Sequence, residues 1–222
     1  MAEDRFQAMH RHILAEIWTS DEAYRNLAYL CDDLGHRFAG SDNEHRAADF
    51  LQGKMEAYGL ENVRLETFPM AGWERGDCTL TLTEPVTRDI SAIAMPYCPA
   101  ADLEADVIDV GEGEQVDFER AGAEIRGKIV LTDAETNRPG ERKSHRSDKY
   151  GWALANGAVA CVFINRNPGL LHITGSLPGR DPSSDRATDR EAPIPGIGIT
   201  YEAGMAIRRL AQRGVPRLRL RT

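Results

Sequence analysis

Histidine and acidic side chains are the residues from which a metal site could be built, but their spacing here predicts none. His10 and His12 are two positions apart on a predicted helix, so they point to different faces and cannot grip one ion together. His36 and His45 flank the start of another predicted helix and have no neighbouring acidic pair to complete a ligand set. The sequence contains neither an H-E-x-x-H nor an H-x-D motif, so no zinc site is predicted.

The remaining candidates lie in polar segments. His145, three positions before Asp148, and His172 are predicted to be solvated histidines. Acidic residues recur every four positions at Asp181, Asp185 and Asp189, a spacing that could suggest a calcium loop. The intervening arginines and the absence of the EF-hand pattern favour a solvated loop of mixed charge.

Nucleophilic and phosphate-binding motifs are also missing. The nearest approach to a nucleophile elbow is Thr174–Gly179, which is not G-x-S-x-G and follows no obvious strand. No P-loop and no G-x-G-x-x-G motif occurs. We therefore predict no catalytic and no metal-binding residue in this chain, and the sequence leaves its substrate-binding residues unknown.

Composition limits the partners. The 222 residues are 41% hydrophobic and 28% charged, as in an ordinary globular protein, and the net charge of -8 argues against a nucleic-acid surface. No stretch reaches about 18 apolar residues, so no membrane span is expected. The acidic start of the chain does not resemble a signal peptide, and a cytoplasmic location is the expectation. Cys31, Cys78 and Cys161 are predicted to be buried free thiols.

The elements that must position any site fall into two groups. Three amphipathic helices are predicted first. The first covers 3–18, and the second begins at a capping box, Thr19–Glu22, and ends at Gly35. The third runs from Asp42 to Tyr58 and begins at a capping box formed by Ser41 and Glu44. Alternating or apolar runs then predict strands. These runs are 62–68, 78–83, 90–94, 105–110, 127–131, 159–164, 196–199 and 217–220.

Helices are interspersed among the later strands. A short helical turn is expected at 118–122, a helix capped by Ser147 over 148–156, and a helix capped by Thr200 over 201–213. The polar stretch 165–192 between them is a loop. In the last strand, Arg217, Arg219 and Arg221 are predicted to form its solvated face. The fold class is therefore α/β, with helices followed by a β-rich unit around a mixed sheet.

Two segments resemble one known family. The first is Gly35-His36-Arg37-Phe38-Ala39-Gly40-Ser41 with the apolar helix that follows, which is similar to the N-terminal segment of the zinc exopeptidases of metallopeptidase family 28, the aminopeptidase S and aminopeptidase Y group. The second comprises Ile125–Leu131, Ala155–Val162 and Ile194–Ile199, which resemble the protease-associated (PA) domain inserted in many of those enzymes.

The resemblance implies a division of the chain into 1–72, the helical part of a peptidase domain; 73–214, a PA-like domain; and 215–222, a return strand toward the catalytic domain. In that family the ligands of two zinc ions and the catalytic glutamate follow the PA insert, beginning with an H-x-D motif. No position here matches them. The resemblance therefore implies an N-terminal fragment of a zinc exopeptidase that is inert by itself, whose partners are the missing catalytic domain and, in the parent, a peptide substrate.

Two further expectations follow. Three apolar helix faces with little sheet to cover them predict a large exposed apolar patch or self-association. The alternative reading is a stand-alone PA-like module that binds peptides or proteins without catalysis. For it, the loop 165–192 with Tyr150, Trp152 and His172 would be the surface to test, although such aromatic residues are more often part of a core.

Overall fold

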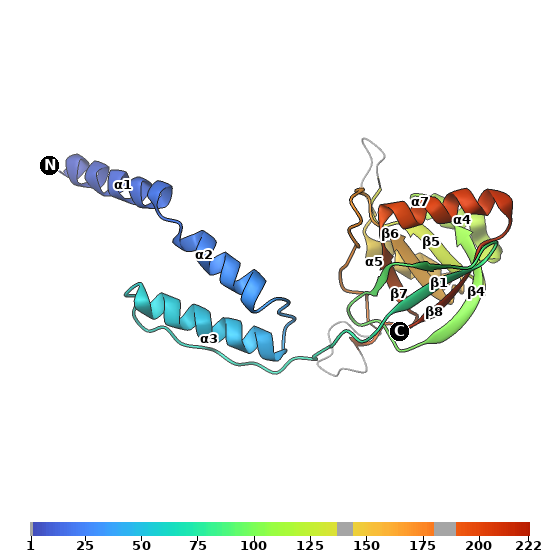
Figure 1. Ribbon diagram of the computed structural model, residues 1–222, viewed down its shortest axis with the longest axis horizontal. Helices are drawn as coiled ribbons and strands as arrows, with labels where there is room; N and C mark the ends of the chain where they lie inside the picture. The colour runs from blue at the N-terminus through green and yellow to red at the C-terminus, as the bar shows by residue number, and fades with distance from the viewer. Residues whose placement is uncertain (1, 137–143, 180–189) are drawn as a thin grey trace. The chain divides into compact units, whose positions relative to one another are not determined.

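The computed structural model describes residues 2–136, 144–179 and 190–222, which form two compact units, residues 1–68 and 69–222 (Figure 1). The first unit is helical. Its elements are α1 (Ala2–Thr19), α2 (Glu22–Ala28), the π-helical turn η1 (Tyr29–Asp33) and α3 (Asp42–Ala57). Among the described residues, no helix combines the length and the apolar character that a membrane span needs.

The second unit holds the sheet. Its strands are β1 (Thr79–Glu84), β2 (Arg88–Ile90), β3 (Ala92–Ala94), β4 (Asp102–Asp109), β5 (Ile129–Asp133), β6 (Ala160–Ile164), β7 (Gly196–Ile199) and β8 (Arg217–Arg221). Its helices are α4 (Gln115–Ala121), α5 (Arg146–Ala155) and α7 (Tyr201–Leu210), with the short turns η2 (Gly122–Ile125) and η3 (Ala211–Arg213). The expected α/β class with a mixed sheet is confirmed.

The strand order is β2-β1-β8-β4-β5-β6-β7-β3. Strands β4 to β7 are parallel to one another, whereas β8 runs antiparallel to both of its neighbours. Its alternating sequence explains this central place, because Leu218 and Leu220 are buried while the arginines between them are exposed. The solvated arginine face is thus confirmed. Residues 217–221 join β1 to β4 inside the sheet.

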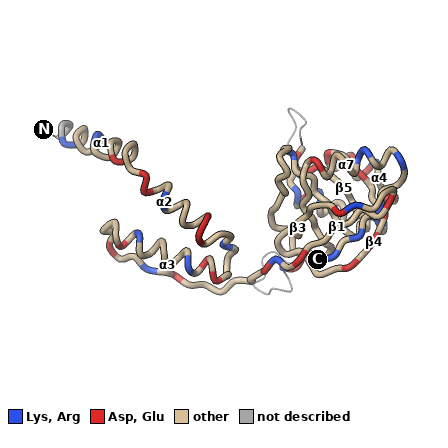
Figure 2. The backbone as a smooth tube through the Cα atoms, in the orientation of Figure 1, with Lys and Arg blue, Asp and Glu red and all other residues tan. Residues whose placement is uncertain are grey.

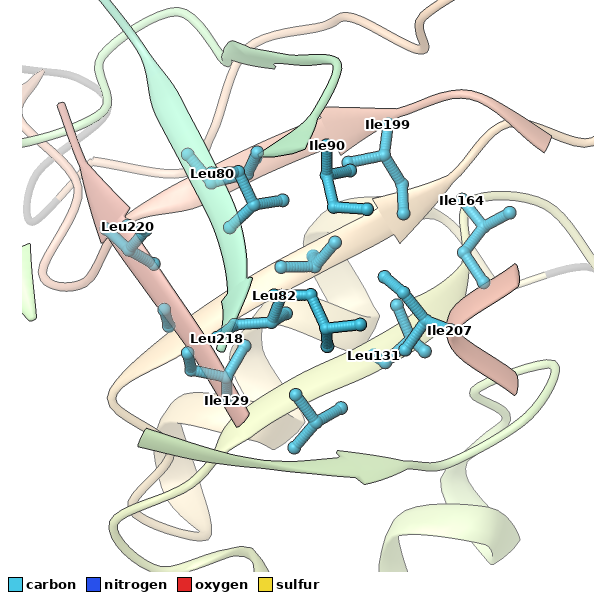
Figure 3. Packing of buried hydrophobic residues seen from close by; sticks show 14 residues of the cluster. Leu80, Leu82, Ile90, Ile129, Leu131, Ile164, Ile199, Ile207, Leu218 and Leu220 are labelled. Carbon is cyan, nitrogen blue, oxygen red and sulfur yellow. The ribbon is translucent and has the colours of Figure 1, made fainter. Parts of the chain in front are cut away.

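Each face of the parallel strands carries its own core. On one face, Leu80 and Leu82 of β1 share a core with Ile129 of β5 and Ile207 of α7 (Figure 3). On the other face, α4 and α5 cover the sheet through residues such as Phe118. Because β5 and β6 are covered on both sides, the first three residues of β5 and all of β6 are apolar, which is the pattern of a buried parallel strand.

Several local predictions differ from the structure. Residues 62–68 form no strand, because no neighbouring strand pairs with them in the described part of the chain. The predicted capping box at Thr19–Glu22 does not form either. Asp21 is the N-cap residue of α2, and its side chain makes no capping hydrogen bond. His145 rather than Ser147 caps α5, and its ring nitrogen accepts from the backbone of Ser147.

The cysteines are free thiols. Cys161 is buried, as predicted, and burial strongly raises its pKa. Cys78 is only half-buried, and burial raises its pKa to about 11. Cys31 is exposed, so the expectation of a buried thiol is wrong there.

Candidate functional site

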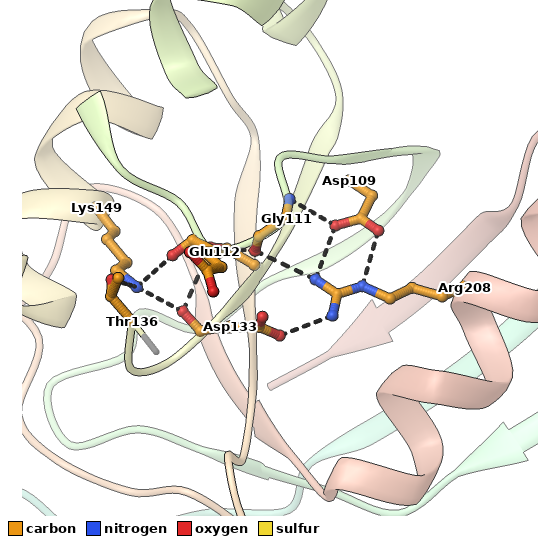
Figure 4. A network of polar contacts seen from close by, with 8 residues as sticks. Asp109, Gly111, Glu112, Asp133, Thr136, Lys149 and Arg208 are labelled. Atoms are coloured by element: carbon orange, nitrogen blue, oxygen red, sulfur yellow. Dashed lines mark hydrogen bonds and ion pairs between the residues drawn. The ribbon is translucent and has the colours of Figure 1, made fainter. Parts of the chain in front are cut away.

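The carboxyl edge of the parallel strands is the first place to look for a site, because open α/β sheets bind ligands at that edge. Asp109 is the last residue of β4 and Asp133 the last residue of β5. These strands are parallel neighbours, so the two aspartates lie at one edge of the sheet. Charged side chains from α5 and α7 converge on the loops that follow them (Figure 4).

Arg208 of α7 holds the two aspartates together. Its Nε and Nη2 donate to the two carboxylate oxygens of Asp109 at 2.8 and 3.1 Å, and its Nη1 donates to Asp133 Oδ1 at 2.8 Å. The same guanidinium also donates to the carbonyl oxygen of Gly111 at 3.2 Å. The side chain of Arg208 is 23% exposed, so these contacts are only partly screened by water.

Lys149 of α5 enters the same region from the other side and is fully buried. Its Nζ donates to the carbonyl oxygens of Glu112 and Asp133 at 2.6 and 2.8 Å and lies 3.4 Å from Thr136 Oγ1. An ammonium has three protons, so three acceptors satisfy it. Lys149 therefore fastens the loop after β4 to the loop after β5.

Glu114 completes the cluster at the start of α4. Its carboxylate accepts from the hydroxyl groups of Thr136 and Ser144, and it forms a reciprocal capping box with Asp117. A capping box satisfies backbone N–H groups that the first turn of a helix would otherwise leave unpaired. The side chain of Glu114 thus has a structural role.

The electrostatics of the cluster follow from its burial. Burial raises the pKa of Asp133, and the neighbouring Arg208 acts against that rise. Burial lowers the pKa of Lys149, and the carboxylates of Glu114 and Asp133 oppose that effect. Because Lys149 and Arg208 both direct their N–H groups to protein acceptors, we interpret this cluster as a structural lock between two loops and two helices.

The residues described by the structure do not fit the two zinc ions that the family resemblance implies. Nowhere in the ranges 2–136, 144–179 and 190–222 do three histidine, cysteine or acidic side chains gather closely enough to hold a metal ion. His10 and His12 lie on α1, and His145 caps α5. Asp181, Asp185 and Asp189 are outside the described residues. No step of hydrolysis is therefore derived from this chain.

The motif in the first unit has a structural role. Arg37 donates to the carbonyl oxygens of Leu30 and Gly35, which closes the end of η1. Ser41 caps α3 by accepting from the backbone of Glu44 at 3.3 Å, as predicted. The carboxylate of Glu44 lies 3.6 Å from the ring of His45. These residues fix the turn between two helices.

The aromatic residues proposed for a binding surface belong mainly to the core. Tyr150 is buried, and its hydroxyl group donates to the carbonyl of Ile194 and accepts from that residue's N–H. Trp152 packs on Phe118 with ring centroids 5.6 Å apart. His172 is half-buried, as is Trp152, and its Nε2 lies 2.9 Å from Ser91 Oγ. The structural interpretation of the two larger aromatic residues is thus confirmed.

Comparison with known proteins agrees with this architecture. The PA domain family model matches residues 96–207, just over half of the chain. Carboxypeptidase Q from Bos taurus is 27% identical over 199 residues, which cover 87% of this chain and 40% of that protein. Thus the chain spans about 40% of the length of the curated relatives it matches.

Two solved structures extend the comparison. A zinc aminopeptidase from Bacillus subtilis is 25% identical with a TM-score of 0.61, and the match covers 90% of this chain and 42% of that chain. A peptidase M28 precursor from Shewanella amazonensis SB2B shares the fold with a TM-score of 0.75 at 21% identity, over 98% of this chain and 50% of that chain. Residues 96–207 form a PA domain. The chain belongs to the PA domain family, and its resemblance to the peptidases of metallopeptidase family 28 that carry such a domain is confirmed.

Proposed function

We propose that this chain is the N-terminal part of a zinc-dependent exopeptidase, to which it supplies the first helices of the peptidase domain and a PA domain. The names of its relatives support this reading, since one is a carboxypeptidase and another a zinc aminopeptidase. In the whole enzyme, two zinc ions would activate a water molecule and polarise the scissile carbonyl. Their ligands would come from residues outside this sequence.

The observation that carries the proposal is the exposed apolar surface of the first unit. Large apolar side chains are exposed along all three helices, and Trp18 is 84% exposed. The group comprises Phe6, Met9, Ile13, Leu14, Ile17, Trp18, Tyr24, Leu27, Leu51, Met55 and Tyr58. Only Leu34 and Ala47 are buried among the described hydrophobic residues of these helices and their connections.

An exposed apolar surface of this kind is stabilised when another part of a protein covers it. Burying one large apolar side chain contributes about 1.5–3 kcal/mol, so the eleven exposed ones represent a large unrealised stabilisation. Amphipathic helices of α/β domains normally bury these faces against a central sheet. We propose that the sheet of the catalytic domain covers α1, α2 and α3 in the parent enzyme.

The second unit has a different role in this proposal. It has its own sheet and two cores, and acidic and basic side chains are interspersed along it (Figure 2). We propose that this PA domain forms a wall of the active-site cleft and limits access to short peptides or free chain ends. The chain by itself would then bind no catalytic zinc and would be inert.

The test uses the purified chain. With added zinc, it should release no amino acids from aminoacyl nitroanilides or dipeptides, whereas zinc-dependent release above the blank would contradict its inertness. The chain should also bind an apolar dye such as ANS or self-associate. Replacing Ile13 and Ile17 with serine should reduce both effects, and replacing the polar Arg11 and Glu16 with serine is the matched control. A monodisperse monomer without affinity for the dye would contradict the uncovered surface.

A further inference from the structure

A groove of about 340 Å³ lies between β2 and α7. Four consecutive residues, Arg88 to Ser91, line it on the strand side, and Ala203, Ala206 and Arg209 line it on the helix side. Side chains of successive strand residues point to opposite faces. A cavity that touches four residues in a row therefore follows the backbone of the strand.

The backbone along this groove belongs to an edge strand. β2 is the first strand in the order of the sheet and pairs only with β1, through Leu80 opposite Ile90 and Leu82 opposite Arg88. No other described strand pairs with its second side. An edge strand presents unpaired N–H and C=O groups, which are a template for another extended chain.

The floor of the groove is apolar. Ile90 and Ala206 are buried, and Ala203 is half-buried. Leu170 stands on the wall and is 71% exposed, although its loop is held firmly: the Glu202 carboxylate accepts from the backbone N–H groups of Gly169 and Leu170 at 2.7 and 3.2 Å. A small apolar side chain could therefore be enclosed without rearrangement of the loop.

Two arginines and two carboxylates line the groove, but only the carboxylates are engaged by other parts of the second unit among the described residues. Asp89 accepts from Thr81 Oγ1 at 2.9 Å, and Glu202 is engaged by the loop. Arg88 and Arg209 line the groove, and neither makes an ion pair within the described ranges. Two arginines beside an apolar floor complement a carboxylate, which a guanidinium can bind through two parallel hydrogen bonds.

We propose that this groove binds a short extended peptide with a free C-terminal carboxylate. The peptide adds a strand to the open edge of β2, places one small apolar side chain against Ala203 and Ala206, and directs its carboxylate to the guanidinium of Arg209 with Arg88 beside it. Three residues of strand span about 10 Å. The groove therefore matches a peptide of three or four residues. Binding requires no catalysis, so this site does not depend on the proposed exopeptidase function.

The probe is a fluorescein-labelled Gly-Gly-Val-Val peptide with a free carboxylate, titrated with the full chain and followed by fluorescence anisotropy. Its C-terminal amide should bind about tenfold more weakly, because it loses the charge-assisted hydrogen bonds. Two further peptides carry a single N-methyl group, one at each of the two valines. Because alternate N–H groups of a strand face the same neighbour, one methylated peptide should lose binding at least tenfold and the other should bind within about twofold of the parent.

Variants of the chain locate the site. Arg209→Gln should weaken binding of the free carboxylate about tenfold and leave the amide unchanged. Arg213→Gln removes the same charge from an exposed position outside the groove and should have no effect. Ala203→Leu fills the floor and should abolish binding, while circular dichroism verifies that each variant is folded. Equal binding of acid and amide, equal effects of the two N-methyl groups, no binding of the parent peptide, or insensitivity to Arg209→Gln would each overturn the proposal.

Discussion

Replacing Arg208 with methionine should destabilise the second unit, because it removes the cation that joins the loops after β4 and β5. Methionine keeps most of the aliphatic volume of the arginine, so the effect isolates the charge. The change leaves Asp109 and Asp133 side by side at one edge of the sheet, 34% and 21% exposed, with no guanidinium between them. Two carboxylates in this situation repel each other and lose their strongest hydrogen bonds.

The size of the effect follows from the exposure of the three side chains. Breaking a buried ion pair by removing one partner costs about 3–5 kcal/mol, whereas exposed pairs contribute about 0.2–1 kcal/mol. Arg208, at 23% exposure, lies between these limits. We therefore expect a loss of about 2 kcal/mol in the free energy of unfolding, which corresponds to a decrease of about 4–8 °C in Tm for a unit of this size.

The pH dependence has a definite sign. Burial raises the pKa of Asp133 in the folded state above its usual value of 3.8. A carboxyl group of this kind binds more protons when folded than when unfolded. Its ionisation therefore weakens the fold as pH rises, and this penalty disappears as pH falls through the folded pKa. Removing Arg208 raises the pKa of Asp133 further. The decrease in the free energy of unfolding caused by the variant should therefore be largest near pH 8 and smaller near pH 4.5.

Urea unfolding followed by near-UV circular dichroism measures the loss at both pH values. Arg213→Met is the matched control, since Arg213 is exposed and forms no ion pair among the described residues. Adding Asp133→Asn to the Arg208 variant should restore about half of the loss, because the neutral amide removes one of the two uncompensated charges. A loss below about 0.5 kcal/mol, or one that is the same at both pH values, would refute the structural role assigned to Arg208.

Two further substitutions test the polar cluster and the family motif. Lys149→Met should destabilise the second unit by about 2–4 kcal/mol, since it leaves the carbonyl groups of Glu112 and Asp133 without their buried donor; urea unfolding measures this, and an unchanged midpoint would contradict it. Ser41→Ala should cost the first unit about 1 kcal/mol of helix stability without altering the second unit, a difference that amide hydrogen exchange of α3 would reveal.

Elements with a local cause could be predicted from the sequence. The Asp42–Tyr58 helix and its Ser41 cap, the helix after Thr200 and the alternating strand β1 all appear within a residue or two of their expected places. Each depends on side chains that are neighbours in the sequence. The M28 and PA resemblance is confirmed for the same reason, because it depends on short motifs in a fixed order.

Elements that need a distant partner were not predictable in this way. Residues 62–68 alternate like a strand, but alternation alone does not supply a neighbouring strand. The polar cluster gave no sequence signal either, since Asp109 and Arg208 are 99 positions apart. Lys149 sits in a polar helical turn and would be expected at the surface. It is buried because the loops that accept its protons come together only in the folded sheet.

The central position of β8 bears on how the PA domain can assemble. β1 and β4 both pair with β8, and no other described strand links the β1–β2 hairpin to the parallel strands by backbone pairing. During synthesis, the hairpin emerges more than 130 residues before its neighbour, as the hydrogen bond between Thr83 and Arg217 indicates. Closing so long a loop is slow. The edge of the hairpin that pairs with β8 therefore stays unpaired until β8 has been synthesised. During this time the nascent chain would be most exposed to pairing with another copy.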